Sequence, residues 1–418
     1  MPRKALMFAA AISLCGQVVV KQQGFVPFSD APIHYRSENL DDPIARLQKR
    51  LDDGQLRLHY DPEHGYLWSI MDALGVPLSS QTLVFSKTSF QYPKISPEKP
   101  RALYFNDDVY AGRVHEGKSL EFISFDPMQG AIFYILDEQQ VDQPRFERAE
   151  NDCVQCHVAA SSTRGVPGVM LRSIFTRPNG AQAGGTPAFI TGQESAFKDR
   201  WGGWYVTGYQ GSHMGNPARN LGSSDVVAHL VLAHQTQMHN LITQTNYQAR
   251  IAAYNEAAKN KAAGVAEDTP LSEAARKKYE APAEELVRYL LFANEAPLTE
   301  PVRGDSGFAE EFAARGIRDS QGRSLRDFDL KTRIFKYPCS YLIYSDAFDS
   351  LPRPAKEYVY RRLLDVLTGR DQSPDFARLT AKDRKDVLEI LLATKPAVQE
   401  AWKDYSAQQD KQYKTQKQ

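Results

Sequence analysis

Cys153-Val154-Gln155-Cys156-His157 is the stretch around which this chain is organised, and it has the pattern C-x-x-C-H. The pattern is typical of sites where a c-type haem is attached. Two cysteines three residues apart lie on the same side of a helical turn, so their sulfurs can bond the two vinyl groups of one porphyrin. The histidine that follows can bind the iron as its proximal ligand. The stretch therefore predicts covalent haem c on Cys153 and Cys156, with His157 on the iron.

A disulfide bond, a redox-active C-x-x-C and half of a zinc site are the other interpretations of these residues. A zinc site needs further Cys or His ligands at a recognisable spacing. Cys339 is the one other cysteine of the expected mature chain, and no histidine pair follows at that spacing. A thioredoxin-like site is expected between a strand and a helix of a βαβ unit, whereas residues 148–152 and 159–162 are typical of loops. The lack of further zinc ligands and of a predicted βαβ unit favours haem attachment over these alternatives.

The N-terminus has the layout of a short secretory signal peptide over residues 1–15. Pro2-Arg3-Lys4 forms its charged start, and residues 5–14 form an apolar segment that is too short to span a bilayer as a helix. Because c-type haem is attached outside the cytoplasm, we expect an exported, periplasmic protein. Cys15 would allow membrane association through a lipid, although the bulky Leu14 stands where a lipidation signal has a small residue.

The composition is that of a globular protein with balanced charge. A chain of 418 residues with 42% hydrophobic residues can bury a substantial core over two or three domains. Its 51 basic residues equal its 51 acidic residues, which argues against nucleic acid or an anionic membrane surface as the main partner. After the signal peptide we expect a β-rich region over 16–145, a haem c-binding region over 146–260 and a helical region over 261–418.

Residues 16–145 are predicted to form a mostly antiparallel sheet. Short helices are expected over 43–51, with Pro43 in the first turn, and over 66–74, before Gly75. From residue 81 to 136, apolar or alternating segments are separated by Asp, Pro and Gly, which is typical of antiparallel strands. A minimal helical cytochrome would not show a sheet directly before its haem motif.

Several residues after the motif could supply the second axial ligand of the iron. The first choice is Met214 or His213, in a loop flanked by glycines. The alternative is Met238 or His234, which lie four residues apart on the apolar stripe of a predicted helix. Met170, in a strand expected over 169–175, is the third choice. A structural role remains open for each of them.

Other conspicuous residues have both a structural and a functional interpretation. Trp201 and Trp204 suit a core corner or a contact with the porphyrin equally well. His229 and His239 are expected to point away from the apolar stripe of their helix. Cys339 lies in an apolar, aromatic run, which predicts a buried and inert thiol.

The C-terminal region is predicted to be helical, over residues 272–293, 308–314, 354–367 and 379–394. Together with the N-terminal strands and the central haem segment, this predicts an α+β fold. The chain has no second C-x-x-C-H and none of the common nucleotide-binding or hydrolase motifs.

Three longer runs resemble a large, uncharacterised family of exported bacterial proteins with a cytochrome c domain. These runs are residues 200–216, with Gly-Gly-Trp-Tyr-Val-Thr-Gly, residues 233–236, with Ala-His-Gln-Thr, and residues 322–340. The resemblance spans most of the expected mature chain. It implies one haem c on Cys153, Cys156 and His157, and it is not tied to a known reaction.

Two functions follow from these observations. The first is electron transfer by a periplasmic monohaem c-type cytochrome with a redox partner protein. The second is a haem-dependent enzyme or sensor, in which an open iron site takes peroxide or another small ligand. Whether the chain is an enzyme is left open by the sequence, and no catalytic residue is assigned.

Overall fold

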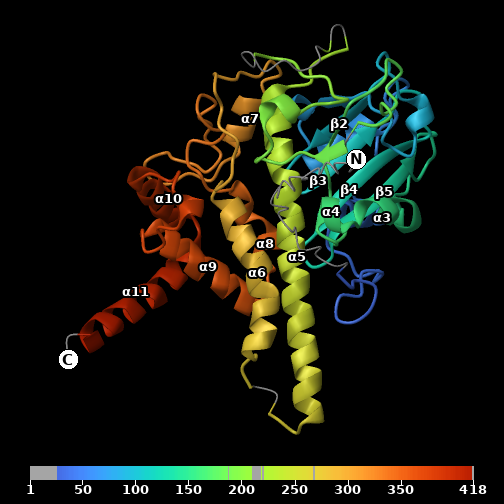
Figure 1. The fold of residues 1–418 in the computed structure, drawn as a ribbon. Coiled ribbons are helices and arrows are strands. Elements are labelled where there is room, and N and C mark those ends of the chain that lie inside the picture. Colours follow the sequence, from blue (N-terminus) through green and yellow to red (C-terminus); the bar gives the residue numbers. More distant parts are fainter. Residues whose placement is uncertain (1–25, 187, 210–217, 219–220, 267–268, 417–418) are drawn as a thin grey trace, which may run out of the picture.

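The computed structural model describes residues 26–186, 188–209, 218, 221–266 and 269–416 (Figure 1). The expected signal peptide lies outside these residues. The prediction of an α+β fold is confirmed, because an antiparallel sheet in the N-terminal half is followed by helices in the C-terminal half.

A six-stranded antiparallel sheet forms the N-terminal half, and its neighbouring strands follow one another in the sequence. The chain therefore runs through the sheet as a meander. Each predicted strand is present, and a short strand that the sequence did not predict completes the edge. The strands are β1 Thr82–Val84, β2 Arg101–Phe105, β3 Val109–Arg113, β4 Ser119–Asp126, β5 Gly130–Asp137 and β6 Glu147–Arg148.

The two faces of the sheet bury different partners, because side chains alternate along each strand. On β4, Leu120 and Phe122 pack into a core with helices α1 (Pro43–Asp52) and α2 (Leu67–Leu74). Ile123, next to Phe122, packs against the larger core on the opposite face, which the C-terminal helices share. The sheet is therefore the middle layer of this half.

The two short helices lie where the sequence predicts them. The Asp42 carboxylate caps α1 and accepts a hydrogen bond from the Ile44 N–H at 2.9 Å, with Pro43 at the first helical position. Helix α2 ends at Gly75, which takes the left-handed conformation at a φ of 63°.

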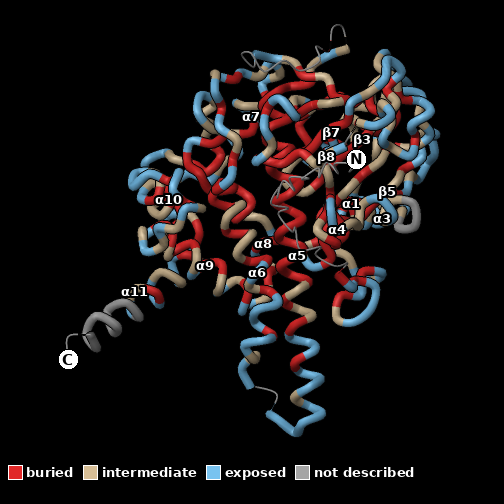
Figure 2. The backbone as a smooth tube through the Cα atoms, in the orientation of Figure 1, coloured by how far each residue is buried: buried red, intermediate tan, exposed pale blue. Residues whose placement is uncertain are grey.

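Helix α5 (Val226–Ala262) lies between the sheet and the other C-terminal helices (Figure 1). Every residue from Val226 to Tyr247 is buried, as the red upper part of this helix shows in Figure 2. The sequence predicted one buried apolar stripe on this helix, with His229 and His239 outside it. Both histidines are instead as fully buried as His234. The cause is that the sheet covers one side of α5 and the C-terminal helices cover the other.

The C-terminal half is helical, and its helices begin with α5, before residue 261. Among the described residues, no helix combines the length and the apolar composition that crossing a bilayer requires. The other helices are α6 Glu273–Leu290, α7 Phe308–Ala314, α8 Asp346–Asp349, α9 Arg353–Leu367, α10 Ala381–Thr394 and α11 Pro396–Gln416.

Residues 150–152 and 160–162, on either side of the C-x-x-C-H motif, are helical, so the prediction of loops there is wrong. Ala149 and Ala159 lie outside helices and strands, as predicted. Helix α3 (Glu150–His157) holds the motif, and the single turn α4 (Ala160–Thr163) follows it. Helices of this length are too short to show a 3.6-residue pattern. Strand β6 precedes α3, but the sheet of the described residues is antiparallel and forms no βαβ unit.

Candidate functional site

Helix α3 presents all three motif side chains to one cavity. Cys153, Cys156 and His157 line it together, and no disulfide bond joins the two sulfurs. The helix ends at His157, and the Val158 N–H donates to the Val154 carbonyl at 3.0 Å. The cavity has a volume of about 300 Å³ and is partly open to solvent. Ligand pockets in proteins begin at about this size.

One face of the sheet forms the floor of this cavity. Phe133, on β5, packs against the His157 ring with 5.0 Å between ring centroids. The floor residues are mainly apolar, so the sheet offers a broad surface that suits a planar aromatic ligand. The strand register aligns them in two rows, Leu103, Gly112, Glu121 and Ile135 in one, and Phe105, Tyr110, Ile123 and Phe133 in the other.

The opposite wall comes from the chain after the motif and from α5. The Trp204 indole N–H donates to the Arg172 carbonyl at 2.8 Å, which fixes the ring at the cavity. Trp201 instead packs against Phe197, with 5.6 Å between ring centroids. Trp204 therefore lines the cavity wall, whereas Trp201 packs in the core. The wall is lined by Val169, Met170, Leu171, Trp204, Leu232 and Thr236.

His157 is held as a neutral imidazole with one nitrogen available. Its Nδ1–H donates to the Gly168 carbonyl at 2.9 Å, and Nε2 has no hydrogen-bond partner within the described residues. Burial lowers the pKa of His157, so the ring stays uncharged near neutral pH. Metal-bound histidines have this arrangement, with one N–H on a backbone carbonyl and the other nitrogen on the metal. The residues present therefore fit an axial ligand of haem iron.

Asn240, on α5, positions the loop that carries this carbonyl. Its Oδ1 accepts from the Val169 N–H at 2.9 Å, and its Nδ2 donates to the Val169 carbonyl at 2.7 Å. The Gly168 N–H also donates to the His157 carbonyl at 3.0 Å. A Cβ at Gly168 would lie 2.2 Å from Asn240 Oδ1, so this close approach requires glycine.

An ion pair lies on the cavity floor, where Arg101 crosses Gly112 to reach Glu121. The Glu121 carboxylate also accepts from Ser89 Oγ and Gln91 Nε2, each at 2.8 Å. A Cβ at Gly112 would lie 2.6 Å from Arg101 Nη2, so glycine lets the guanidinium lie against the sheet. Arg101 Nε is buried without a partner among the described residues. A ligand that carries carboxylates, as a porphyrin does, would find a donor here.

The first-choice axial ligands, Met214 and His213, lie outside the described residues. Met170 lines the cavity, but in the irregular segment that precedes strand β7 (Arg172–Ile174) and not in a strand as predicted. The Met170 sulfur accepts from Arg172 Nη2 at 3.4 Å.

The alternative axial ligands lie on α5 away from the cavity lining. The His234 ring bonds Gln193 Oε1 through Nδ1 at 2.6 Å and Ser340 Oγ through Nε2 at 2.7 Å. Met238 is fully buried in the larger core. Neither residue is among those that line the cavity with His157. Both nitrogens of His234 are thus engaged in hydrogen bonds that span the core.

Cys339, the cysteine outside the motif, lies in the core. Cys339 is fully buried, as predicted, and burial raises its pKa to about 12. In the part of the chain that the structure describes, no group of three or more His, Cys, Asp or Glu side chains is arranged to hold a bare metal ion.

Sequence reasoning missed the floor of the cavity. Glu121 is a charged residue inside a predicted strand, and Arg101 directly precedes another. These charges were the available signal that this face of the sheet is not only packed into a core. Which strand residues face one another follows from the register, and the segments do not specify it by themselves.

Comparison with family models, curated proteins and solved structures finds no match to this chain. Its function is therefore inferred from the residues around the cavity alone.

Proposed function

We propose that this chain is an exported, periplasmic c-type cytochrome that binds one haem c covalently and exchanges electrons with a partner protein. The observation that carries the proposal is the cavity shared by Cys153, Cys156 and His157, with His157 Nδ1 bonded to the Gly168 carbonyl. Two thiols and a neutral imidazole with a free nitrogen are the donor set of a c-type haem.

Each of these residues has a defined part in the proposal. Cys153 and Cys156 hold the porphyrin through thioether bonds, and His157 Nε2 binds the iron. The bound group supplies one-electron chemistry between ferric and ferrous iron. Phe133 and Trp204 present apolar rings to the cavity, and an apolar surrounding disfavours the additional positive charge of the ferric state.

Covalent attachment is tested by changing the two cysteines together. Cys153→Ser with Cys156→Ser removes both thioether positions, so the exported protein is expected to lose haem stain from its band in a denaturing gel. The matched control is Cys339→Ala, which removes a buried thiol outside the cavity and is expected to keep the stain. Stain that persists in the double variant, or a colourless wild-type protein, contradicts the proposal.

A haem-dependent enzyme or sensor with an open iron site is the second candidate, and Tyr110 favours it. Tyr110 lines the cavity and its hydroxyl accepts from Gln235 Nε2 at 2.9 Å. Within the described residues no acceptor takes the phenol proton, so it is available to a ligand on the iron.

Optical spectra of the reduced protein separate the two candidates. Six-coordinate, low-spin iron whose spectrum does not change with carbon monoxide supports a role in electron transfer. Five-coordinate, high-spin iron whose spectrum shifts with carbon monoxide supports the open site. The spectrum also tests whether a second axial ligand is present at all.

A further inference from the structure

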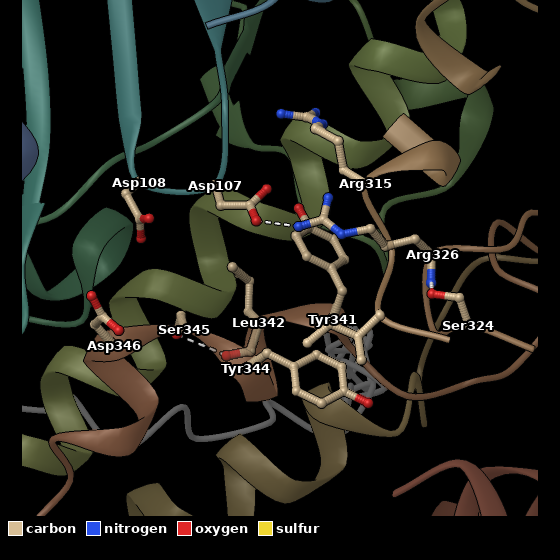
Figure 3. A pocket seen from close by; sticks show the side chains of 11 residues that line it. Asp107, Asp108, Arg315, Ser324, Arg326, Tyr341, Leu342, Tyr344, Ser345 and Asp346 are labelled. Carbon is tan, nitrogen blue, oxygen red and sulfur yellow. Dashed lines mark hydrogen bonds and ion pairs between the residues drawn. The ribbon is translucent and has the colours of Figure 1, made fainter. Parts of the chain in front are cut away.

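A second cavity, of about 270 Å³, opens between the β2–β3 turn and the C-terminal half (Figure 3). It shares none of its lining residues with the cavity of the C-x-x-C-H motif. Charged side chains dominate it, and they are Asp107, Asp108, Asp346, Arg315 and Arg326. We call it the charged cavity.

Arg326 forms the basic side of the charged cavity. Its guanidinium lies between two aromatic rings, 4.5 Å from the Phe312 centroid and 4.4 Å from the Tyr341 centroid, and it pairs with Asp107. Arg326 is only 9% exposed. Its Nη1 is nevertheless buried without a hydrogen-bond partner among the described residues. A buried donor left without a partner costs about 1–3 kcal/mol, so a ligand acceptor at this position would be favoured.

Asp108 and Asp346 form the acidic side of the charged cavity. Figure 3 shows Asp108 and Asp346 together, across the charged cavity from Arg315 and Arg326. Burial, reinforced by the carboxylates of Asp107 and Asp346, raises the pKa of Asp108 to about 7. A carboxyl in this state is stabilised in its charged form by a nearby cation.

Apolar side chains lie next to these two charged sides. Leu342 is buried, whereas Ile317 is 50% exposed at the charged cavity. A large aliphatic side chain exposed to this extent beside a cavity can pack against an apolar part of a ligand. The lining thus combines an acidic side, a basic side and an aliphatic patch.

We propose that the charged cavity binds a small zwitterion with an aliphatic side chain, of the α-amino acid class. The ligand carboxylate accepts from Arg326 Nη1 and Arg315, and the ligand ammonium pairs with Asp108. The aliphatic side chain packs against Ile317. Neither a simple anion nor a simple cation would complement both sides. This inference does not rest on haem binding.

The test uses isothermal titration calorimetry of the full protein with L-leucine and two analogues that each lack one charge. 4-Methylpentanoate lacks the ammonium, and 3-methylbutylamine lacks the carboxylate. We expect leucine to bind and each analogue to bind at least about tenfold more weakly, because each leaves one side of the cavity unpaired. No heat from leucine, or equal affinity for either analogue, overturns the proposal.

Substitutions on each side of the charged cavity test which residues bind the two charges of leucine. Arg315→Gln and Asp108→Asn are each expected to weaken leucine binding about tenfold or more. The controls are Arg303→Gln and Glu310→Gln, which remove like charges from exposed side chains outside the cavity and are expected to leave the affinity unchanged. Equal weakening by the controls would show a general charge effect and refute the assignment.

Proton release gives an independent readout. The raised pKa leaves part of the Asp108 carboxyls protonated near neutral pH, and pairing with an ammonium expels that proton. Titrations in two buffers of different ionisation enthalpy are therefore expected to show net proton release when leucine binds, and no release from Asp108→Asn. Binding without release, or release that persists in this variant, places the ammonium elsewhere and overturns the proposed pose.

Discussion

The Gly168 carbonyl determines which nitrogen of His157 is available to a metal, because it takes the proton of Nδ1. The carbonyl is held at its position by the two hydrogen bonds between Asn240 and the Val169 backbone. A residue on a different element, seventy-one positions along the chain from Val169, thus fixes the tautomer of the proposed iron ligand.

Asn240→Ala is predicted to destabilise the protein and to loosen His157. Both Val169 backbone groups lose their buried partners, at about 1–3 kcal/mol each, so the free energy of unfolding in urea should fall by about 2–6 kcal/mol. The comparison variant is Asn246→Ala on the same helix, which removes only long bonds, to the Ser350 carbonyl at 3.2 Å and from Arg250 Nη1 at 3.4 Å, and should cost less. Equal stability of Asn240→Ala and wild type would contradict the role of Asn240.

The second axial ligand is predicted to be His213 or Met214, and not Met170. If the iron of the proposed cytochrome is six-coordinate, changing the ligating residue of this pair to Ala should convert it to high spin. Met170→Leu should leave the spectrum unchanged, because the Met170 sulfur accepts from Arg172 Nη2 at 3.4 Å. A high-spin spectrum in Met170→Leu alone would reverse this assignment.

At the scale of elements, α5 carries three buried histidines that stay neutral in the folded protein. Burial lowers the pKa of His229 and His234 to about 3 and that of His239 to about 4. In the unfolded chain a histidine binds its proton below about pH 6.5. The unfolded state therefore gains more protons than the folded state as the pH falls below 6.5, and stability is lost at about 1.4 kcal/mol per pH unit for each histidine.

His234→Gln is predicted to change this pH dependence in a defined direction. The variant should be less stable than wild type at pH 7, because the bonds to Gln193 and Ser340 are disturbed. The difference in the free energy of unfolding between wild type and variant should narrow by about 1.4 kcal/mol per pH unit between pH 6 and 4, because only the wild type loses the contribution of this residue. His59→Gln, at an exposed position, is the control and should show no narrowing. A gap that stays constant would mean that His234 is not neutral in the folded state.

Sequence patterns predicted the elements best where one residue type marks a boundary or one face is buried. Asp42 and Pro43 at the start of α1, and Gly75 at the end of α2, are such markers. The cysteines of the motif were expected on a helical turn, and they lie in α3. The start of this helix at residues 150–152 was predicted as a loop, because a helix of eight residues has too few turns for periodicity to appear. The full burial of α5 was also missed, since polar residues such as His239 are buried there by partners that lie far away in the sequence.

At the scale of the whole molecule, the candidate site depended on pairing that the sequence does not display. Cys153, Cys156 and His157 were found from their spacing, whereas the floor under them became visible only with the register of β2 to β5. The lining of the cavity extends beyond residues 146–260, because its floor residues belong to the sheet between Arg101 and Ile135. The sheet and the later chain build the candidate site together.

Gln235, on α5, links the two cavities through a buried bridge. The Tyr341 hydroxyl, from the charged cavity, donates to Gln235 Oε1 at 2.5 Å. Gln235 Nε2 donates to the Tyr110 hydroxyl, in the motif cavity, at 2.9 Å and to the Asn106 carbonyl at 2.7 Å. The bridge joins the sheet, the central helix and the C-terminal half, so the phenols at its two ends should depend on each other energetically.

A double-mutant cycle of Tyr110→Phe and Tyr341→Phe is predicted to be non-additive, with a coupling of at least about 0.5 kcal/mol in the free energy of unfolding. The hydroxyls do not touch, but removing either one frees the Gln235 amide to turn, so the remaining bond is worth less. The control pairs Tyr341→Phe with Tyr360→Phe, whose buried hydroxyl has no partner among the described residues. That pair should be additive, and Tyr360→Phe alone should cost nothing. Additivity in the first cycle would mean that the two cavities are energetically independent, because the bridge would then carry no coupling between the halves of the molecule.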